Sequence, residues 1–479
     1  MAVTVIPERF APVLAELAPL ASRFAADGHR LYLVGGAVRD LLLGGDRGDY
    51  DLDLTTDARP PAVKRLLDGW GDAVWTQGER FGTIGARRAG ADGAARMVEV
   101  TTFRSEAYVD SSRKPHVTFA DDIEIDLGRR DFTVNSMALE LTGEVALVDP
   151  FDGAADLATG TLRTPLAPEV SFDDDPLRML RAARFIAGYG LHPVAELTAA
   201  VAERGERLEI VSRERIRDEL DKLIGVDRPG AGLWFLVDTG LAEQFLPELP
   251  ALRLEHDPIH RHKDVLSHTI AVVENVRPSG DVGFDFRLTR LAALFHDVGK
   301  PRTRGYQPGK GTTFHHHDVV GARMTRRRME ELRYPTADIT AVAELVFLHL
   351  RFHTYKMGWS DSAVRRYVRD AGGLLAELNT LTRADCTTRD ERKAARLALR
   401  MDELEARVQQ LAAGEELAAL RPELDGREVM EHLGVAPGPV VGEALAYLLE
   451  IRLEEGEIGH AEARKRLDAW WHEHNSTDG

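Results

Sequence analysis

The chain has 479 residues and a formal net charge of −17, with 61 basic against 78 acidic side chains. This acidic balance excludes a generally basic nucleic-acid binder, so any bound nucleic acid must meet a local basic face. The length predicts about three domains. The single cysteine, Cys386, excludes an internal disulfide and a CxxC zinc site. No apolar run has the roughly 18–20 residues that a membrane span needs, so we expect a cytoplasmic protein with no membrane partner.

The first informative stretch is LYLVGGAVRDLLLGGDRGDYDLDLTT, which begins at Leu31. Its pattern predicts a strand, a turn at Gly35 and Gly36, and a short helix over Ala37–Leu43. Such a turn exposes backbone N–H groups at a helix N-terminus, where the helix dipole favours an anion. Arg39 adds a cation that can bind phosphate with two nitrogens. The turn is therefore a candidate phosphate cradle.

The same stretch ends in a predicted second strand that carries Asp51 and Asp53. Residues two apart in a strand share a face, and two adjacent carboxylates repel unless a cation lies between them. Hard divalent cations prefer such oxygen ligands. Glu99, in MVEVTTF, is either a third metal carboxylate or a solvated strand acid. A phosphate cradle followed by an acid pair favours nucleotidyl transfer, although each motif alone is common without a site.

Local patterns divide the rest of the chain into a strand-rich first part and a helical remainder. Three further strands are predicted, at Val74–Gln77, Phe81–Arg87 and Met97–Phe103. The polar segment Arg104–Phe119 has no clear period and is expected to be a mobile loop. From Pro176 onward the pattern is helical, and Asp175 is expected to cap the first of these helices.

Three more blocks identify a family. RRDFTVNSMA begins at Arg129, SFDDDPLRMLRAARF spans 171–185 and VSRERIRDEL spans 211–220. Together with LVGGAVRD and DYDLD, they resemble the tRNA nucleotidyltransferases that add CCA to tRNA (bacterial, class II) and the related bacterial poly(A) polymerases. The resemblance implies a multi-domain α+β protein. A small mixed α/β head with a polymerase-β-like palm is expected at 1–165, followed by an all-α neck at 166–250 that carries the nucleotide-selecting helix.

The resemblance also implies roles for individual residues. Asp51 and Asp53 would be catalytic and hold two Mg²⁺ ions. The nucleotide would be bound by Gly35, Gly36, Arg39, Arg129, Arg130, Asp131, Asn135, Asp175, Arg178, Arg181 and Arg184. Asp175 and Arg178 would recognise the base, because a carboxylate beside a guanidinium can match its Watson–Crick edge. Structural alternatives stay open: Arg129 and Arg130 as salt-bridge partners, and Asp175 as a helix cap.

Histidines form a second group of candidate site residues, apart from those of the head. Ten of the seventeen lie between 256 and 353, eight of them within HKDVLSHTI, HDVGK, HHHD and HLRFH. This resembles an HD domain, a helical metal-dependent phosphohydrolase fold, expected at 251–390 and followed by a helical tail at 391–479. The implied metal ligands are His268, His296, Asp297 and Asp385, with His317 and His349 at a second position. Imidazoles and carboxylates together leave the identity of this divalent metal open, and an inactive domain kept for packing or RNA docking is the alternative.

The favoured function is addition of CCA to tRNA from CTP and ATP without a nucleic-acid template. Alternatives are poly(A) addition, partial addition of CC or A, a phosphohydrolase acting through the HD domain, or a tRNA-binding scaffold. The expected partners are tRNA, CTP and ATP, while the sequence leaves the oligomeric state open. Three basic groups are candidate RNA contacts: Arg323, Arg326 and Arg327; Lys393, Arg396 and Arg400; and Arg365, Arg366 and Arg369.

Overall fold

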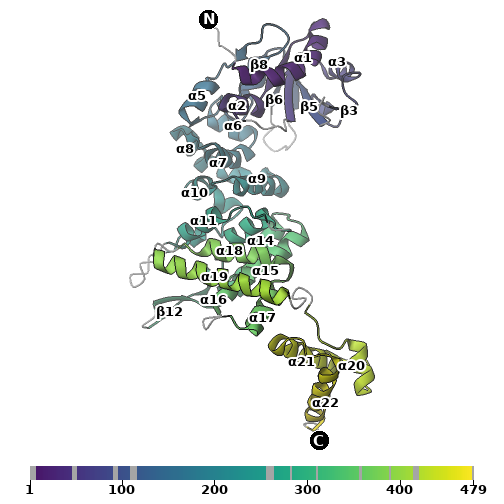
Figure 1. The fold of residues 1–479 in the computed structure, drawn as a ribbon. Coiled ribbons are helices and arrows are strands. Elements are labelled where there is room, and N and C mark those ends of the chain that lie inside the picture. The colour runs from purple at the N-terminus through teal and green to yellow at the C-terminus, as the bar shows by residue number, and fades with distance from the viewer. Residues whose placement is uncertain are drawn as a thin grey trace. The chain divides into compact units, whose positions relative to one another are not determined.

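The structure, a computed structural model, describes residues 7–45, 51–89, 95–107, 116–254, 264–280, 283–308, 311–354, 359–387, 390–413 and 420–476. The chain forms two compact units, Met1–Pro247 and Glu248–Gly479. The expected α+β class is confirmed, because the large sheet lies in the first unit and helices dominate the second (Figure 1). Among the described helices, none is both long enough and apolar enough to span a membrane.

The head is built on a seven-stranded sheet with the strand order β3-β4-β5-β2-β1-β8-β9. Only β2 and β5 pair in parallel; the other neighbours are antiparallel. The strands are β1 (Leu31–Val34), β2 (Asp51–Thr56), β3 (Ala73–Trp75), β4 (Thr83–Ala89), β5 (Ala95–Thr102), β8 (Ala138–Glu140) and β9 (Leu147–Val148). β4 begins two residues later than predicted, because a 3₁₀ turn over Glu79–Phe81 ends at Gly82, whose φ is +87°.

One face of this sheet packs against helices. The covering helices are α1 (Ala11–Ala26), α2 (Gly36–Leu43) and α3 (Pro60–Leu67). Leu52 and Leu54 of β2 are buried in the core that these helices share with the sheet. Because side chains alternate along a strand, Asp53 projects from the opposite face. The side chain of Asp51 lies outside the described part of the chain.

The segment Arg104–Phe119 departs from the predicted loop. Its ends form the antiparallel strands β6 (Arg104–Ala107) and β7 (His116–Phe119), paired from Arg104 opposite Phe119 to Ala107 opposite His116. The residues between them lie outside the described ranges. The polar composition hid the hairpin, because the strands are four residues long and too short to show alternation.

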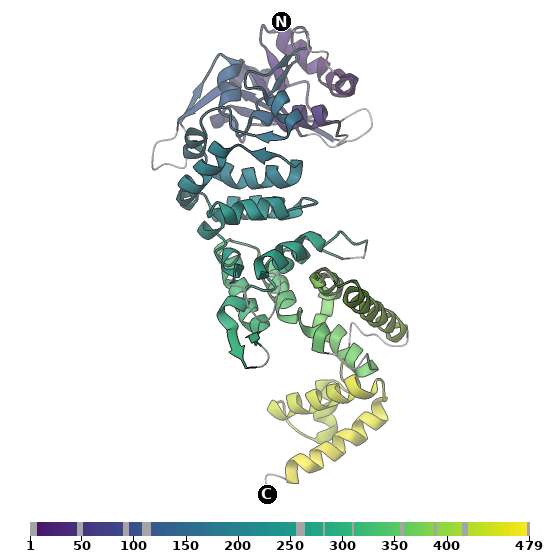
Figure 2. The same cartoon turned by 90° about the vertical axis from the view of Figure 1, so that its left-hand side faces the viewer.

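Helices complete the first unit, and those of the neck lie in successive layers next to the head (Figure 2). The remaining head helices are α4 (Ile123–Gly128) and α5 (Gly153–Thr159). The neck helices are α6 (Pro168–Asp174), α7 (Leu177–Tyr189), α8 (Ala195–Arg204), α9 (Arg213–Gly225) and α10 (Gly230–Asp238). The short strand β10 (Thr161–Leu162) pairs with β11 (His192–Pro193). The predicted helix start is displaced, because Asp175 has extended backbone at the end of α6 and α7 begins at Leu177.

The described part of the second unit is helical apart from one hairpin, β12 (Arg304–Gln307) with β13 (Gly311–Phe314). Its helices are α11 (Val265–Asn275), α12 (Phe286–Phe295), α13 (Lys300–Thr303), α14 (His317–Glu331), α15 (Thr336–Leu348), α16 (Arg351–Thr354), α17 (Asp361–Ala371), α18 (Leu375–Asp385), α19 (Glu391–Ala412), α20 (Gly426–Leu433), α21 (Pro439–Glu455) and α22 (His460–Ser476). The last three share a small core around Val429, Leu448 and Leu467.

Candidate functional site

The acids of the head lie next to one another on neighbouring strands. In the parallel pairing of β2 and β5, Asp53 lies directly opposite Glu99. Both residues are exposed and project from the face opposite α1, α2 and α3. The register thus brings Glu99 beside the predicted metal acids, as its interpretation as a third carboxylate requires.

The glycine turn at Gly35 and Gly36 lies next to the acid row, which Asp53 and Glu99 together form. Gly35 has a φ of +73°, a conformation that L side chains rarely adopt. A Cβ at position 35 would lie 3.1 Å from Nη1 of Arg130 and 3.9 Å from Oδ2 of Asp53. The backbone of the turn therefore lies close to both a guanidinium and a carboxylate, at the N-terminus of α2. These are the surroundings that a phosphate bridging a cation and a metal-bound acid would need.

Arg39 lies deeper than its predicted role suggests. It is buried, and its guanidinium donates to Oδ1 of Asn135 at 2.5 Å, to the hydroxyl of Tyr189 at 2.5 Å and to Oδ1 of Asp40 at 2.9 Å. The guanidinium carbon also lies 4.2 Å from the centroid of the Tyr189 ring. Arg39 thus joins α2 to the end of α7, through a tyrosine that no sequence motif indicated.

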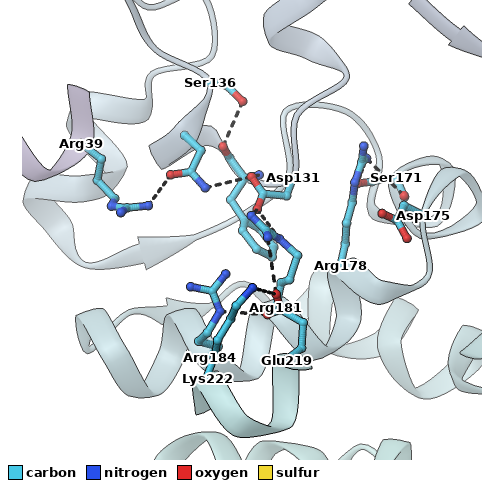
Figure 3. Close-up of polar contacts among 12 residues, drawn as sticks. Arg39, Asp131, Ser136, Ser171, Asp175, Arg178, Arg181, Arg184, Glu219 and Lys222 are labelled. Carbon is cyan, nitrogen blue, oxygen red and sulfur yellow. Dashed lines mark hydrogen bonds and ion pairs between the residues drawn. The ribbon is translucent and has the colours of Figure 1, made fainter. Parts of the chain in front are cut away.

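Asp131 connects the head to α7, the predicted nucleotide-selecting helix (Figure 3). It accepts hydrogen bonds from Nδ2 of Asn135 at 2.9 Å and from the Arg181 guanidinium at 2.5 and 2.8 Å. Burial opposes its charged form, but Arg181 and the bond from Asn135 outweigh it and lower the pKa of Asp131 to about 2. Beyond it, Arg181 and Arg184 share Glu219 of α9. A continuous polar network therefore runs from Arg39 to α9.

The paired arginines of RRDFTVN both have an acidic partner. Asp126, fully buried in α4, lies 2.8 Å from Arg129 and 3.4 Å from Arg130. Burial opposes its charged form, yet the two cations lower the pKa of Asp126. The structural interpretation of this pair therefore holds for both arginines. It leaves room for a ligand, because Nη1 of Arg130 also faces the glycine turn.

A cavity of about 950 Å³ lies between the head and the neck of the first unit. Glu99, Arg129 and Trp75 line it from the head, and Asp175, Arg178 and Arg215 line it from the neck. Its volume falls in the range of small-molecule sites, and charged groups of both signs face it.

The predicted base-recognising pair lies on the neck wall of this cavity. Asp175 accepts from the Leu177 backbone N–H at 3.1 Å, as a cap would, and from Arg215 at 2.8 Å. Arg178 is buried and donates to Ser171 Oγ at 2.8 Å and to the Arg129 carbonyl at 2.5 Å. These bonds fix the direction of the guanidinium. The two side chains thus have separate partners, so the helix-cap alternative accounts for Asp175 and leaves Arg178 unexplained.

The second unit brings all six implied metal ligands together. One group consists of His268, His296 and Asp385, and an adjacent group consists of Asp297, His317 and His349. Oδ2 of Asp297 lies 3.3 Å from Nε2 of His296, and its Oδ1 lies 3.5 Å from Nε2 of His317. Asp297 therefore lies between the two groups, in the position of a bridging carboxylate.

The hydrogen bonds of three histidines fit a metal, while for His296 burial is outweighed by the neighbouring Asp297 and Asp385, which raise the pKa. Nδ1 of His296, His317 and His349 donates to the carbonyl oxygens of Ala293, Phe314 and Val346 at 2.6–2.8 Å. In the neutral rings the Nε2 lone pairs are then free to coordinate, and such second contacts are typical of metal-binding histidines. Burial lowers the pKa of His349 to about 4, so it is neutral near pH 7. Two Nε2 atoms, of His317 and His349, lie only 3.2 Å apart. Neutral lone pairs that close repel unless a cation lies between them.

The structure contradicts one residue of the three basic groups predicted as RNA contacts, Arg365. Arg365 is buried and donates to the Leu453 carbonyl at 3.3 Å. Arg366 lies 2.7 Å from Glu450 and 2.6 Å from Glu454. Both arginines therefore join α17 to α21, and Arg365 is withdrawn from solvent. The helical spacing alone could not reveal a partner more than eighty residues away.

Three protein-family models match segments of this chain. The Poly A polymerase head domain matches residues 31–163, and the Probable RNA and SrmB-binding site of polymerase A matches residues 190–252. The HD domain matches residues 265–412. The head match includes the glycine turn and the acid row, while the HD match includes all six clustered ligands.

Curated relatives extend the match along the chain. An A-adding tRNA nucleotidyltransferase of Deinococcus radiodurans is 35% identical over 450 residues, covering 91% of this chain and 95% of its own length. A CCA-adding enzyme of Lactobacillus gasseri is 38% identical over 247 residues, and the match spans 51% of this chain and 57% of that relative. The crystal structure of the Bacillus stearothermophilus CCA-adding enzyme in complex with CTP has the same fold, with 23% identity and a TM-score of 0.68 over 98% of this chain and 100% of that one. The sequence blocks and the near full-length match agree, and the chain belongs to the tRNA nucleotidyltransferase family.

Proposed function

We propose that this protein adds CCA to the 3′ end of tRNA from CTP and ATP, selecting each nucleotide without a nucleic-acid template. The observation that carries the proposal is one cavity with Glu99 of the acid row on its head wall and Asp175 and Arg178 on its neck wall. Chemistry and base recognition then meet in a single space, as selection by side chains requires. The names of the relatives support the substrate class.

In the proposed reaction the 3′-oxygen of the RNA bonds to the α-phosphorus of the nucleotide. The bond from that phosphorus to the oxygen bridging the α- and β-phosphates breaks, pyrophosphate leaves with those electrons, and the hydroxyl proton passes to solvent. Gly35 and Gly36 hold the triphosphate at the start of α2, and the Arg39 network fixes this turn. Arg178, oriented by Ser171 and the Arg129 carbonyl, presents its donors to the base beside Asp175. The chain thus supplies position and orientation, which dominate phosphoryl transfer.

The acid row fits Mg²⁺. Asp53 and Glu99 are opposed across neighbouring strands, and a divalent cation offsets the repulsion of like charges this close. Asp51 and Asp53 would hold the ions, with Glu99 as a third carboxylate. When bound, Mg²⁺ lowers the cost of the charge that develops on the attacking and leaving oxygens.

Addition of A alone is a second candidate, and one observation favours it. The relative that matches nearly the whole chain is an A-adding enzyme, whereas the match to the CCA-adding relative spans 57% of that protein. The catalytic residues would be the same in both cases. The difference would lie in whether the cavity accepts cytosine at all.

Two RNA substrates separate these candidates. One is a tRNA that ends at the nucleotide before CCA, and the other ends in CC; each is given CTP, ATP and Mg²⁺, and the products are sequenced. CCA addition predicts that both RNAs end in CCA. Extension of only the second RNA, by a single A, would assign A addition, and a run of A residues would assign poly(A) synthesis.

We further propose that the histidine cluster holds two divalent metal ions and gives the second unit phosphohydrolase activity. The six converging ligands and the fixed Nδ1 atoms support it. Replacing His296 and Asp297 by alanine should abolish hydrolysis of a phosphomonoester or cyclic phosphate and leave nucleotide addition intact. Replacing Asp51 and Asp53 by alanine should do the reverse. Loss of nucleotide addition in the HD variant would show instead that this cluster is needed for transfer.

These roles assign a different step to each domain of a cytoplasmic protein. The head at 1–165 would catalyse transfer, the neck at 166–250 would choose the nucleotide, and the HD body at 251–390 would hydrolyse phosphate esters. The tail at 391–479 would complete the body. Expression of 1–250 alone, followed by an incorporation assay on a short RNA, tests whether transfer and choice are both contained in the first unit.

A further inference from the structure

An aromatic side chain continues the acid row towards the edge of the sheet. Glu99 of β5 lies opposite Gly85 of β4, and Gly85 lies opposite Trp75 of β3. Directly opposed residues project from the same face of a sheet, so Trp75, Glu99 and Asp53 share the face opposite α1, α2 and α3. Their neighbours Val74 and Val98 pack in the core on the other face.

The indole lies across Gly85 towards the acids. A Cβ at position 85 would lie 2.1 Å from Cε2 and 2.2 Å from Nε1 of Trp75. The ring therefore occupies the space that a side chain on β4 would take. Since neighbouring strands lie about 4.8 Å apart, the distance from the ring to Glu99 is roughly one strand spacing. Trp75 is half-buried, and both it and Glu99 line the cavity.

The order of strands fixes which substrate reaches this ring. The glycine turn follows β1, the acids lie on β2 and β5, and Trp75 lies on β3, beyond β4. In phosphoryl transfer the attacking and leaving oxygens lie roughly in line on opposite sides of the reacting phosphorus. With the triphosphate at the glycine turn, the attacking 3′-hydroxyl must approach from the side of β5 and β4. The terminal nucleotide of the RNA is thereby directed to Trp75.

We propose that Trp75 stacks on the base at the 3′ end of the acceptor RNA and holds that end against Glu99. This inference rests on the proposed nucleotide transfer and adds the contact that positions the acceptor. A stacking contact suits the task, because CCA addition presents different terminal bases in turn and stacking tolerates any base. Recognition of the incoming base remains on the opposite wall, at Asp175 and Arg178.

The test measures single addition of A to an RNA hairpin that ends in CC, which the enzyme extends under either proposed specificity. Trp75→Leu keeps an apolar side chain and removes the aromatic face, whereas Trp75→Phe keeps a ring. We expect Trp75→Leu to raise the KM for the RNA about tenfold and to leave the KM for ATP within about twofold, since stacking of one base has this magnitude. Trp75→Phe should recover most of the loss.

A second RNA isolates the stacked base. It is the same hairpin with an abasic 3′-terminal nucleotide, which keeps the sugar and its hydroxyl. The wild-type enzyme should lose about tenfold in kcat/KM on this RNA, and Trp75→Leu should show no further loss. Val74→Ala, on the core face of the same strand, is the matched control; it should lower stability without changing the KM for RNA.

Each outcome decides the proposal. An equal abasic penalty in the wild type and in Trp75→Leu would overturn it, as would a rise in the KM for ATP instead of the KM for RNA. A rise in the KM for RNA with Val74→Ala would assign the effect to strand stability and also overturn it. If the wild-type enzyme added no nucleotide to either natural RNA end, the proposed function would fail, a result distinct from normal addition by an unaffected Trp75→Leu.

Discussion

Replacing Asp131 by asparagine tests the network that joins the head to the nucleotide-selecting helix. The asparagine would keep the size of the side chain and its position beside Asn135, but Arg181 would lose its nearest anion, and Glu219 would remain at 3.8 Å. The pKa of Asp131 lies at about 2 instead of its ordinary value of 3.8, which corresponds to about 2 kcal/mol of stability. We therefore expect Asp131→Asn to destabilise this region by about 2 kcal/mol at pH 7.

The sign of the pH dependence follows from the depressed pKa. The stabilisation from Asp131 is fully present above the unfolded pKa of about 4 and is lost as the pH falls through about 2. The difference between wild type and variant should thus be constant from about pH 8 to about pH 5 and shrink below about pH 4. Because the chain has two units, hydrogen exchange of the α7 amides measures this more cleanly than global unfolding.

Asp173 provides the control. It lies in the same unit and its carboxylate is 3.0 Å from Arg207, but its side chain is 40% exposed. Exposed ion pairs contribute at most about 1 kcal/mol, so Asp173→Asn should change α7 protection much less. An Asp131→Asn variant within about 0.5 kcal/mol of wild type, or equal effects of the two substitutions, would refute a stabilising role for the Asp131 charge.

Contacts across the site give three further predictions. Tyr189→Phe removes the hydroxyl that accepts from Arg39 and should lower kcat/KM for the nucleotide by roughly tenfold, with little change in the KM for RNA. Steady-state kinetics would measure this, and an unchanged kcat/KM would show that Tyr189 does not support the phosphate-binding turn. Gly85→Ala forces a Cβ into the Trp75 ring and should destabilise the head by about 1–3 kcal/mol, measured by denaturant unfolding; the Trp75→Leu background should relieve most of this cost. Added Mn²⁺ or Zn²⁺ should raise the melting temperature of the wild type and chelation should lower it, whereas His268→Ala should respond less; equal responses would exclude a metal at His268.

Local patterns could predict the residues to which we assign the chemistry. Leu52 and Leu54 alternate with the acids, and burial of the leucines is enough to set the face of Asp53. The six HD ligands were predicted from their motifs, and the fold brings them together. In both cases the residue types and their spacing indicate the chemistry, so the family resemblance could be identified without knowing the fold.

Partners far apart in the sequence could not be predicted. Tyr189 is 150 residues from Arg39, and an aromatic residue at the end of an amphipathic helix gives no sign that it will accept a hydrogen bond. The pairing of Trp75 with Gly85 depends on the register of β3 against β4. Asp175 was predicted as the cap of a helix because Asp-Pro is a common helix start, and it does accept from the Leu177 backbone N–H at the start of α7. The sequence did not show that α6 ends at the same residue.

In the function proposed for this protein, the acids of the head catalyse nucleotide transfer and the neck selects the nucleotide. The most direct measurement is the ratio of kcat/KM for ATP to that for GTP on an RNA ending in CC, in the wild type, Asp53→Asn and Arg178→Ala. We predict that Asp53→Asn lowers kcat/KM for both nucleotides and preserves the ratio, whereas Arg178→Ala lowers the ratio by at least about tenfold. An unchanged ratio in Arg178→Ala, or a normal rate in Asp53→Asn, would contradict this division of roles.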